Sequence, residues 1–134
     1  MTKVAIIYFS GYGHTVKQAE AKQYATLAWQ DKVAGGFTTS ASVNGDKFNT
    51  ITYFITLSQQ HGQLWVGTGL QASNKMEHGP GDVNWTAGYS GALAIAPSDS
   101  SPDQGSSEGD LETARLYGAR VATAAIRNRV AVAA

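Results

Sequence analysis

The sequence predicts an α/β fold in which helices cover both faces of a doubly wound parallel sheet. Residues Val4 to Phe9 form an unbroken apolar run, which is typical of a strand buried on both faces of a parallel sheet. Strand-like and helix-like stretches then alternate along the chain, as in folds built from right-handed crossovers. At 134 residues the chain has the length of one domain, which we expect to span residues 1–134.

The elements after the first strand are predicted from apolar spacing and from turn residues. Between Thr68 and Asp110 we expect one long loop, interrupted only by a short apolar patch from Gly91 to Ile95. Three strands are few, because such a sheet usually has five or more. The remaining predicted elements are a helix Val16–Ala21 with helical propensity continuing to Lys32, a strand Val33–Ser40, a helix Phe48–Gln60, a strand Leu64–Gly67 and a helix Leu111–Val130.

Composition excludes several classes of function. The formal net charge is zero, so we expect no nucleic-acid partner. The chain has no cysteine, which excludes disulfides, thiolate metal sites and a cysteine nucleophile. The longest apolar run is far shorter than the ~20 residues that span a bilayer, and the first strand leaves no room for a signal peptide. We therefore expect a cytoplasmic protein that is not inserted in a membrane.

A candidate phosphate-binding loop follows the first strand. A strand that runs through a tight turn into a helix directs several free backbone N–H groups to the positive end of the helix dipole. The loop has no lysine and no third glycine, so it is neither a Walker loop nor a dinucleotide fingerprint. Neutral donors remain, and they can hold a phosphate through charge-assisted hydrogen bonds. The alternative is an ordinary strand-to-helix turn. The candidate residues are Ser10, Gly11, Tyr12, Gly13, His14, Thr15 and Val16, where the helix begins.

A second group of hydroxyls follows the second predicted strand. Ligands of open parallel sheets bind beyond the carboxyl ends of the strands, so one ligand can contact this group and the phosphate loop together. The alternative is a helix N-cap and turn made of small polar residues. The residues are Thr38, Thr39, Ser40, Ala41, Ser42 and Val43.

Histidine gives little evidence of catalysis. His61 ends a helix just before a glycine, where a cation is stabilised by the helix dipole. No two histidines have metal-ligand spacing, and no G-x-S-x-G motif is present. We predict neither a metal site nor a catalytic side chain.

Taken together, these stretches resemble one family, the flavodoxin-like NAD(P)H:quinone oxidoreductases of the WrbA type. The turn Ser10–Thr15 resembles the family's flavin phosphate loop, and residues 39–45 resemble its flavin-contacting loop. Trp29–Thr38 is similar to the family's fourth strand and the residues before it. Leu57–Gly62 is similar to the helix end whose histidine reaches the flavin, and Asp110–Gly118 is similar to the last helix.

The resemblance implies FMN as cofactor and NAD(P)H as hydride donor, with a quinone as the substrate that accepts two electrons. It places the phosphate on residues 10–15, Tyr12 near the nicotinamide, residues 38–43 along the isoalloxazine and His61 at its pyrimidine side. It also implies a homo-oligomer, normally a tetramer. The flavin supplies the redox chemistry, and the protein orients and tunes it.

This chain departs from the family near residues 20–25, where the family's second and third strands and their helices are missing. Either the chain is truly shortened, or a middle segment was not recorded. We favour the second explanation, because the gap would expose the core of the sheet at the cofactor site. Two alternative functions remain, an FMN electron carrier of the flavodoxin type and a truncated module that binds no flavin.

Overall fold

The computed structural model describes residues 25–101 and 103–132. The predicted strand Val4–Phe9 and helix Val16–Ala21 lie outside the described residues. The same holds for residues 20–24, where most of the expected gap in the family fold lies. In chain order, the described elements are β1 (Val33–Ala34), β2 (Phe37–Ser40), α2 (Lys47–Gln60), β3 (Leu64–Trp65), β4 (Ala92–Ile95) and α3 (Glu108–Val132).

The centre of the fold is one extended stretch, residues 33–40, whose first and second halves pair with different strands. Its first half, β1, pairs in parallel with β3, and its second half, β2, pairs in parallel with β4. The Val66 N–H donates to the Ala34 carbonyl (2.9 Å), and the Ala92 N–H donates to the Gly36 carbonyl (3.1 Å). The predicted strand over residues 33–40 is therefore interrupted at its two glycines.

Tyr117 of α3 fills the point where the neighbour changes. Its hydroxyl donates to the Val66 carbonyl (2.6 Å) and accepts from the Gly36 N–H (3.1 Å). The side chain is buried, and burial raises the pKa of the phenol above its ordinary value. A Cβ atom on Gly35 would lie 2.5 Å from this hydroxyl oxygen, so only glycine fits there. Close approach of the Tyr117 side chain is thus the reason for this glycine within the strand.

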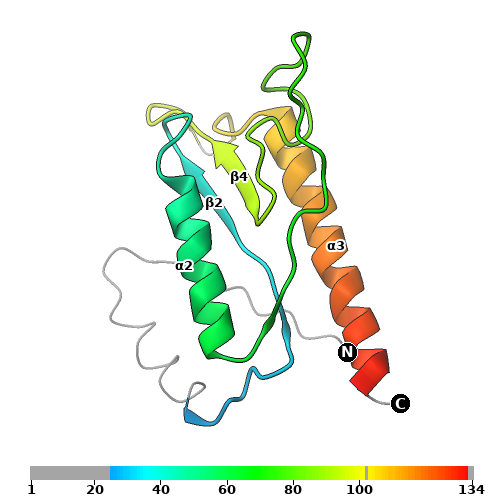
Figure 1. Cartoon of the computed structure of the whole chain (residues 1–134). Coiled ribbons are helices and arrows are strands. Elements are labelled where there is room, and N and C mark those ends of the chain that lie inside the picture. Colours follow the sequence, from blue (N-terminus) through cyan, green and yellow to red (C-terminus); the bar gives the residue numbers. More distant parts are fainter. Residues whose placement is uncertain (1–24, 102, 133–134) are drawn as a thin grey trace.

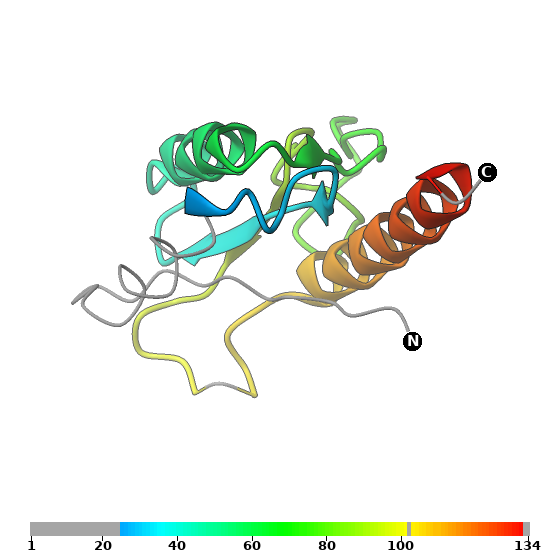
Figure 2. The same cartoon turned by 90° about the horizontal axis from the view of Figure 1, so that it is seen from below.

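The two long helices cover opposite faces of the strands (Figures 1 and 2). Helix α2 packs on β2 and β3, whereas α3 packs on β4 and β1. Ile51 and Ser58 of α2, seven residues apart and so on one face of the helix, are buried. Parallel pairing, crossover helices and two covered faces confirm the predicted doubly wound α/β class.

The buried apolar core of the described residues is small. It consists of Ile51, Ala92 and Tyr117. None of the helices in the described ranges is both long enough and apolar enough to cross a membrane.

Two predictions of secondary structure were wrong. The patch Gly91–Ile95, expected inside a loop, contains strand β4, because its conformation is determined by pairing with the distant β2. Residues 26–31, expected to be helical, form turns in which Leu27 and Asp31 have positive φ angles of 47° and 59°. A left-handed residue interrupts a right-handed helix. The described part therefore has four short strands, where the sequence had predicted two for the same residues.

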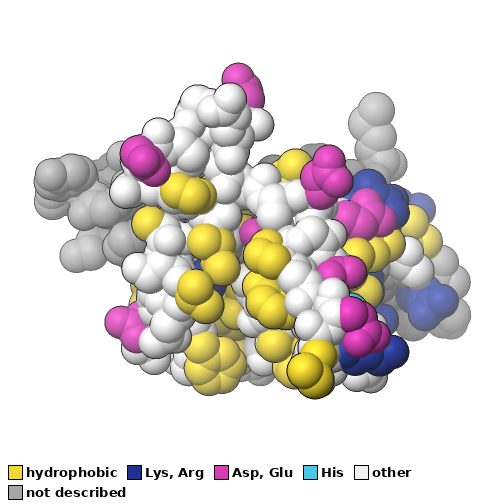
Figure 3. Space-filling view, turned by 90° about the horizontal axis from the view of Figure 1, so that it is seen from above, with side chains coloured by type: hydrophobic (Ala, Val, Ile, Leu, Met, Phe, Trp, Pro, Cys, Tyr) yellow, Lys and Arg dark blue, Asp and Glu magenta, His cyan; other side chains and the backbone are white. Residues whose placement is uncertain are grey.

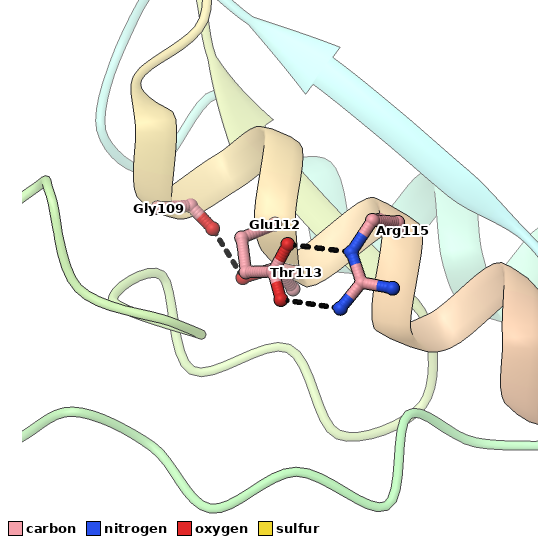
Figure 4. A network of polar contacts seen from close by, with 4 residues as sticks. All are labelled: Gly109, Glu112, Thr113 and Arg115. Atoms are coloured by element: carbon pink, nitrogen blue, oxygen red, sulfur yellow. Dashed lines mark hydrogen bonds and ion pairs between the residues drawn. The ribbon is translucent and has the colours of Figure 1, made fainter.

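Helix α3 begins three residues before the predicted Leu111, at Glu108. The Ser107 hydroxyl accepts a hydrogen bond from the Asp110 N–H (3.1 Å) and so caps the helix. One turn further on, Glu112 and Arg115 form a two-point ion pair with N–O distances of 2.6 and 2.7 Å (Figure 4). The Arg115 hydrogen bonds lower the pKa of Glu112. The pair is exposed and therefore adds little stability.

Between β3 and β4 the chain leaves the sheet and returns over residues 67–91, a segment we call the excursion. The Thr68 hydroxyl donates to the Gly88 carbonyl (2.7 Å), which ties the two ends of the excursion together. Asn84 is 1% exposed; its side chain donates to the Leu70 carbonyl (3.2 Å) and accepts from the Gly88 N–H (2.9 Å). Its own N–H donates to the Thr113 hydroxyl (2.7 Å), which donates in turn to the Gly109 carbonyl (Figure 4). The excursion is therefore anchored on α3.

Replacing Tyr117 by phenylalanine should destabilise the protein. The change removes one oxygen and leaves the Gly36 N–H and the Val66 carbonyl without their partner. We expect the free energy of unfolding in urea to fall by about 1–3 kcal/mol. The control is Tyr53→Phe, which removes the same atom from a tyrosine that is 55% exposed. Equal losses in the two variants would contradict the role given to Tyr117.

Replacing Asn84 by alanine should loosen the excursion. The Leu70 carbonyl and the Gly88 N–H would lose their partner, at about 1–3 kcal/mol for each buried group. The measurement is the rate of tryptic cleavage after Lys75, whose side chain is 69% exposed within the excursion. The control is Asn49→Ala, at an exposed position of α2, which trypsin should cleave at the wild-type rate. An unchanged rate in Asn84→Ala would refute the anchoring.

Candidate functional site

The hydroxyl-rich segment Thr38–Val43 lies at the carboxyl end of β2, beside the carboxyl end of β4 and the first turn of α3 (Figure 1). The Asp110 carboxylate accepts a hydrogen bond from the Ile95 N–H (3.0 Å) and so joins α3 to β4 at this edge. Seen from above, hydrophobic side chains gather in the centre of this end and acidic ones lie around them (Figure 3). This is the edge at which open parallel sheets bind their ligands, as predicted for this segment.

The loop from Ala41 to Asp46 is tightly turned. Gly45 and Asp46 both have left-handed backbones, with φ angles of 53° and 50°. A Cβ atom on Gly45 would overlap the Ser40 side chain. Asp46 is the N-cap of α2 and makes no side-chain cap hydrogen bond. The N-cap position therefore belongs to Asp46 and not to the serine and threonine residues before it, whereas the turn of small polar residues, the other half of the alternative interpretation, is present.

Lys47 lies beneath this loop, although it is the first residue of α2. It is 3% exposed, and its Nζ donates to Ser40 Oγ (2.8 Å), the Ser42 carbonyl (2.9 Å) and the Val43 carbonyl (2.7 Å). Burial lowers the pKa of the ammonium, and the attraction of the Asp110 carboxylate opposes part of that shift. Each N–H of the ammonium thus has an acceptor.

Lys47 was not among the residues predicted from the sequence. A signal was present, because a lysine in the first turn of a helix opposes the helix dipole.

The loop presents backbone N–H groups outward. The N–H groups of residues 41–45 have no hydrogen-bond partner within residues 25–101 and 103–132, and all five residues are exposed. The peptides are trans, so a carbonyl that points to Lys47 turns the next N–H the opposite way. The N–H groups of Val43 and Asn44 therefore point away from the ammonium. The loop can donate hydrogen bonds to an electron-rich ligand.

A pocket lies on each side of the β2–β4 pair. The pocket on the α3 side has a volume of about 180 Å³, and the one on the α2 side about 140 Å³. The pocket on the α3 side is lined by Thr38, Thr39 and Asp110, together with exposed apolar side chains that include Phe37 and Leu111. The second is lined by Phe48, Ile51, Leu93 and residues 87–91. Both faces of the β2–β4 pair therefore carry apolar surface alongside the strands.

His61 lies away from this edge. It is the C-cap of α2, whereas the loop precedes the N-terminus of the same helix, and fourteen helical residues span about 21 Å. His61 is 1% exposed and packs against Trp29, with ring centroids 4.6 Å apart. The fold brings Thr38–Val43 together with Lys47 and Asp110, but it does not bring His61 to them. A contact between His61 and a flavin stays a prediction.

The predicted phosphate loop, Ser10–Val16, lies outside the described residues, so the structure does not place it. In the ranges that the structure covers, no three His, Asp or Glu side chains are grouped so that they could hold a metal ion.

The chain is similar to two proteins named as flavodoxins, while no family model matches it. It is 34% identical to flavodoxin FldP of Pseudomonas aeruginosa (strain UCBPP-PA14) over 177 aligned positions, which cover 91% of this chain and 96% of that protein. The aligned length exceeds the 134 residues of this chain, so the alignment passes over residues that the chain lacks.

The second protein is a flavodoxin, WrbA-like protein from Agrobacterium tumefaciens, whose crystal structure is known. The identity is 41% and the TM-score 0.60, over 89% of this chain and 59% of that one. The present chain thus spans little more than half of the length of this neighbour. The identity to the Pseudomonas protein extends over nearly its whole length, and the fold of the Agrobacterium protein is similar. The chain therefore belongs to the flavodoxin-like proteins.

Proposed function

We propose that the protein binds FMN and is an FMN-dependent NAD(P)H:quinone oxidoreductase. The observation that carries the proposal is at the carboxyl end of β2: the N–H groups of residues 41–45 have no partner within the described residues, and those of Val43 and Asn44 point away from Lys47. The names of the two relatives, one a flavodoxin and the other a WrbA-like flavodoxin, support the same class of ligand.

The residues of this edge fit a flavin. One side of the isoalloxazine ring carries carbonyl oxygens and ring nitrogens that accept hydrogen bonds, and the loop offers N–H donors for them. The apolar pocket on the α3 side of the β2–β4 pair, which Thr38, Thr39 and Asp110 also line, suits the apolar remainder of the ring. Bound FMN would supply the redox chemistry, by taking a hydride equivalent from NAD(P)H and passing it to a quinone.

The protein's own contribution is binding and electrostatics. The loop N–H groups would orient the ring, and they would interact more strongly when reduction adds negative charge to it. The phosphate is assigned to Ser10–Thr15 and the nicotinamide donor to the vicinity of Tyr12, both from the resemblance. We propose no catalytic side chain, because the flavin carries the reaction.

An electron carrier is the second candidate. The observation in its favour is that the Pseudomonas relative is itself named a flavodoxin. A module that binds no flavin is the third, and the small buried core of the described residues favours it. The two can be separated from the leading proposal by direct measurement.

We also propose that the protein acts in the cytoplasm as a homo-oligomer, in the form of a tetramer. Large apolar side chains are exposed near the site, and association would remove them from water. They include Val43 (78% exposed), Phe48 (64%) and Tyr89 (56%).

We propose further that a middle segment is missing near residues 20–25. Two findings support it, namely the 177 aligned positions with the Pseudomonas relative and the 59% coverage of the WrbA-like structure. The mass of the protein isolated from its natural source, measured against the 14.1 kDa of this chain, tests this directly.

Titration with FMN should quench the flavin fluorescence to saturation at one FMN per chain. Riboflavin, which has the same ring without the phosphate, should bind roughly 10- to 100-fold more weakly, because it loses hydrogen bonds to a charged group. A protein that quenches neither flavin would leave only the module that binds no flavin.

The FMN-loaded protein should oxidise NADH or NADPH only when benzoquinone is added. The reaction is followed at the absorbance of the reduced nicotinamide, and free FMN at the same concentration is the control. A loaded protein that leaves the nicotinamide unoxidised in the presence of benzoquinone would contradict the enzyme and favour the carrier.

A further inference from the structure

The first step concerns the carbonyl groups of the loop. The Ser42 and Val43 carbonyls both point inward, because both accept from Lys47 Nζ, at 2.9 and 2.7 Å. The Ser40 hydroxyl reinforces this orientation, since it accepts from the same ammonium (2.8 Å) and donates to the Ser42 carbonyl (2.8 Å). One buried cation thus determines how two successive peptide planes are turned.

The second step concerns stability of that arrangement. The loop residues are exposed, and within the described ranges their N–H groups have no protein partner that would fix them. Without the ammonium, the Val43 carbonyl would lose its partner and could turn toward water, and the Ser42 carbonyl would be held by the Ser40 hydroxyl alone. Lys47 itself has little freedom, because it is 3% exposed and all three of its donors are used. The outward direction of the N–H groups therefore depends on this side chain.

We propose that Lys47 is a positioning residue for the flavin ring: by turning the Ser42 and Val43 carbonyls inward, it aims the N–H groups of Val43 and Asn44 at the ring's acceptors. This inference rests on the proposed binding of FMN at this edge. Reduction adds negative charge to the ring, and a hydrogen bond from an N–H group is stronger when its acceptor is charged. These donors therefore interact more strongly with the reduced ring. Lys47 therefore raises the affinity for reduced FMN more than the affinity for oxidised FMN.

The test is the variant Lys47→Met, which keeps an unbranched side chain and removes the three hydrogen bonds. We expect the dissociation constant of oxidised FMN to rise about tenfold, and that of reduced FMN to rise more. For a two-electron couple, each further factor of ten in favour of the oxidised form lowers the midpoint potential by about 30 mV. The readouts are fluorescence titration and the midpoint potential of the bound flavin.

Two comparison variants accompany it. Lys75→Met makes the same chemical change at an exposed lysine of the excursion and should leave affinity and potential at wild-type values. Ser40→Ala removes one of the three acceptors of the ammonium and the hydroxyl that donates to the Ser42 carbonyl, but it keeps both bonds from the ammonium to the carbonyls. It should therefore give a smaller shift of potential in the same direction. If Lys47→Met does not fold, as judged by circular dichroism, Ser40→Ala provides the test. A lowered midpoint potential in Ser40→Ala then supports the inference, and an unchanged potential overturns it.

The outcomes separate the inference from the proposed function. A wild-type protein that does not bind FMN rejects the proposed function and the inference with it. A wild type that binds FMN, with an unchanged affinity in Lys47→Met, rejects only the role of Lys47. Equal weakening of both redox states, with no change in potential, shows that Lys47 merely supports the fold and also overturns the inference.

Discussion

The hydroxyl of Tyr117 is the contact on which the arrangement of the strands depends. It lies where the strand pairing of residues 33–40 changes from β3 to β4. There it accepts a hydrogen bond from the Gly36 N–H and donates one to the Val66 carbonyl, two groups that neither strand pair satisfies. A buried backbone group without a partner costs as much as a lost hydrogen bond, so the exchange of neighbours requires a group of this kind. The hydroxyl can approach the Gly36 N–H only because the preceding residue, Gly35, has no side chain.

The candidate site follows from that exchange. Because β3 ends before the carboxyl end of residues 33–40, the chain can leave for the excursion and return as β4 beside β2. Strand β4 then leads to α3, and Asp110 in the first turn of that helix accepts from the Ile95 N–H and attracts Lys47. The loop at the end of β2 is therefore supported from two elements that lie far from it in the sequence, and Tyr117 and Asp110 both belong to α3.

What the sequence predicted well are elements determined locally. Helix α2 was placed within one residue at its start, because Ile51 and Ser58 repeat with helical spacing and Gly62 follows the end. Strand β4 was missed because four apolar residues carry no period of their own, and only the pairing with β2 makes them a strand. The turns at Leu27 and Asp31 override a helical propensity. The hydroxyl segment at the end of β2 was found from its position alone, whereas the buried Lys47 that organises it was not.

Lys47 shows why the missed residue is informative. A cation in the first turn of a helix faces the positive end of the dipole, and its burial adds a cost of desolvation, so local physics disfavours it twice. Three hydrogen bonds and the attraction of Asp110 offset these costs, yet an uncharged residue at this place would have avoided them altogether. Residues that break a local rule and are compensated elsewhere concentrate at functional sites. The effect of the ammonium here is specific: it binds two carbonyls and leaves the N–H groups of Val43 and Asn44 pointing away from it, where they can donate to an electron-rich ligand.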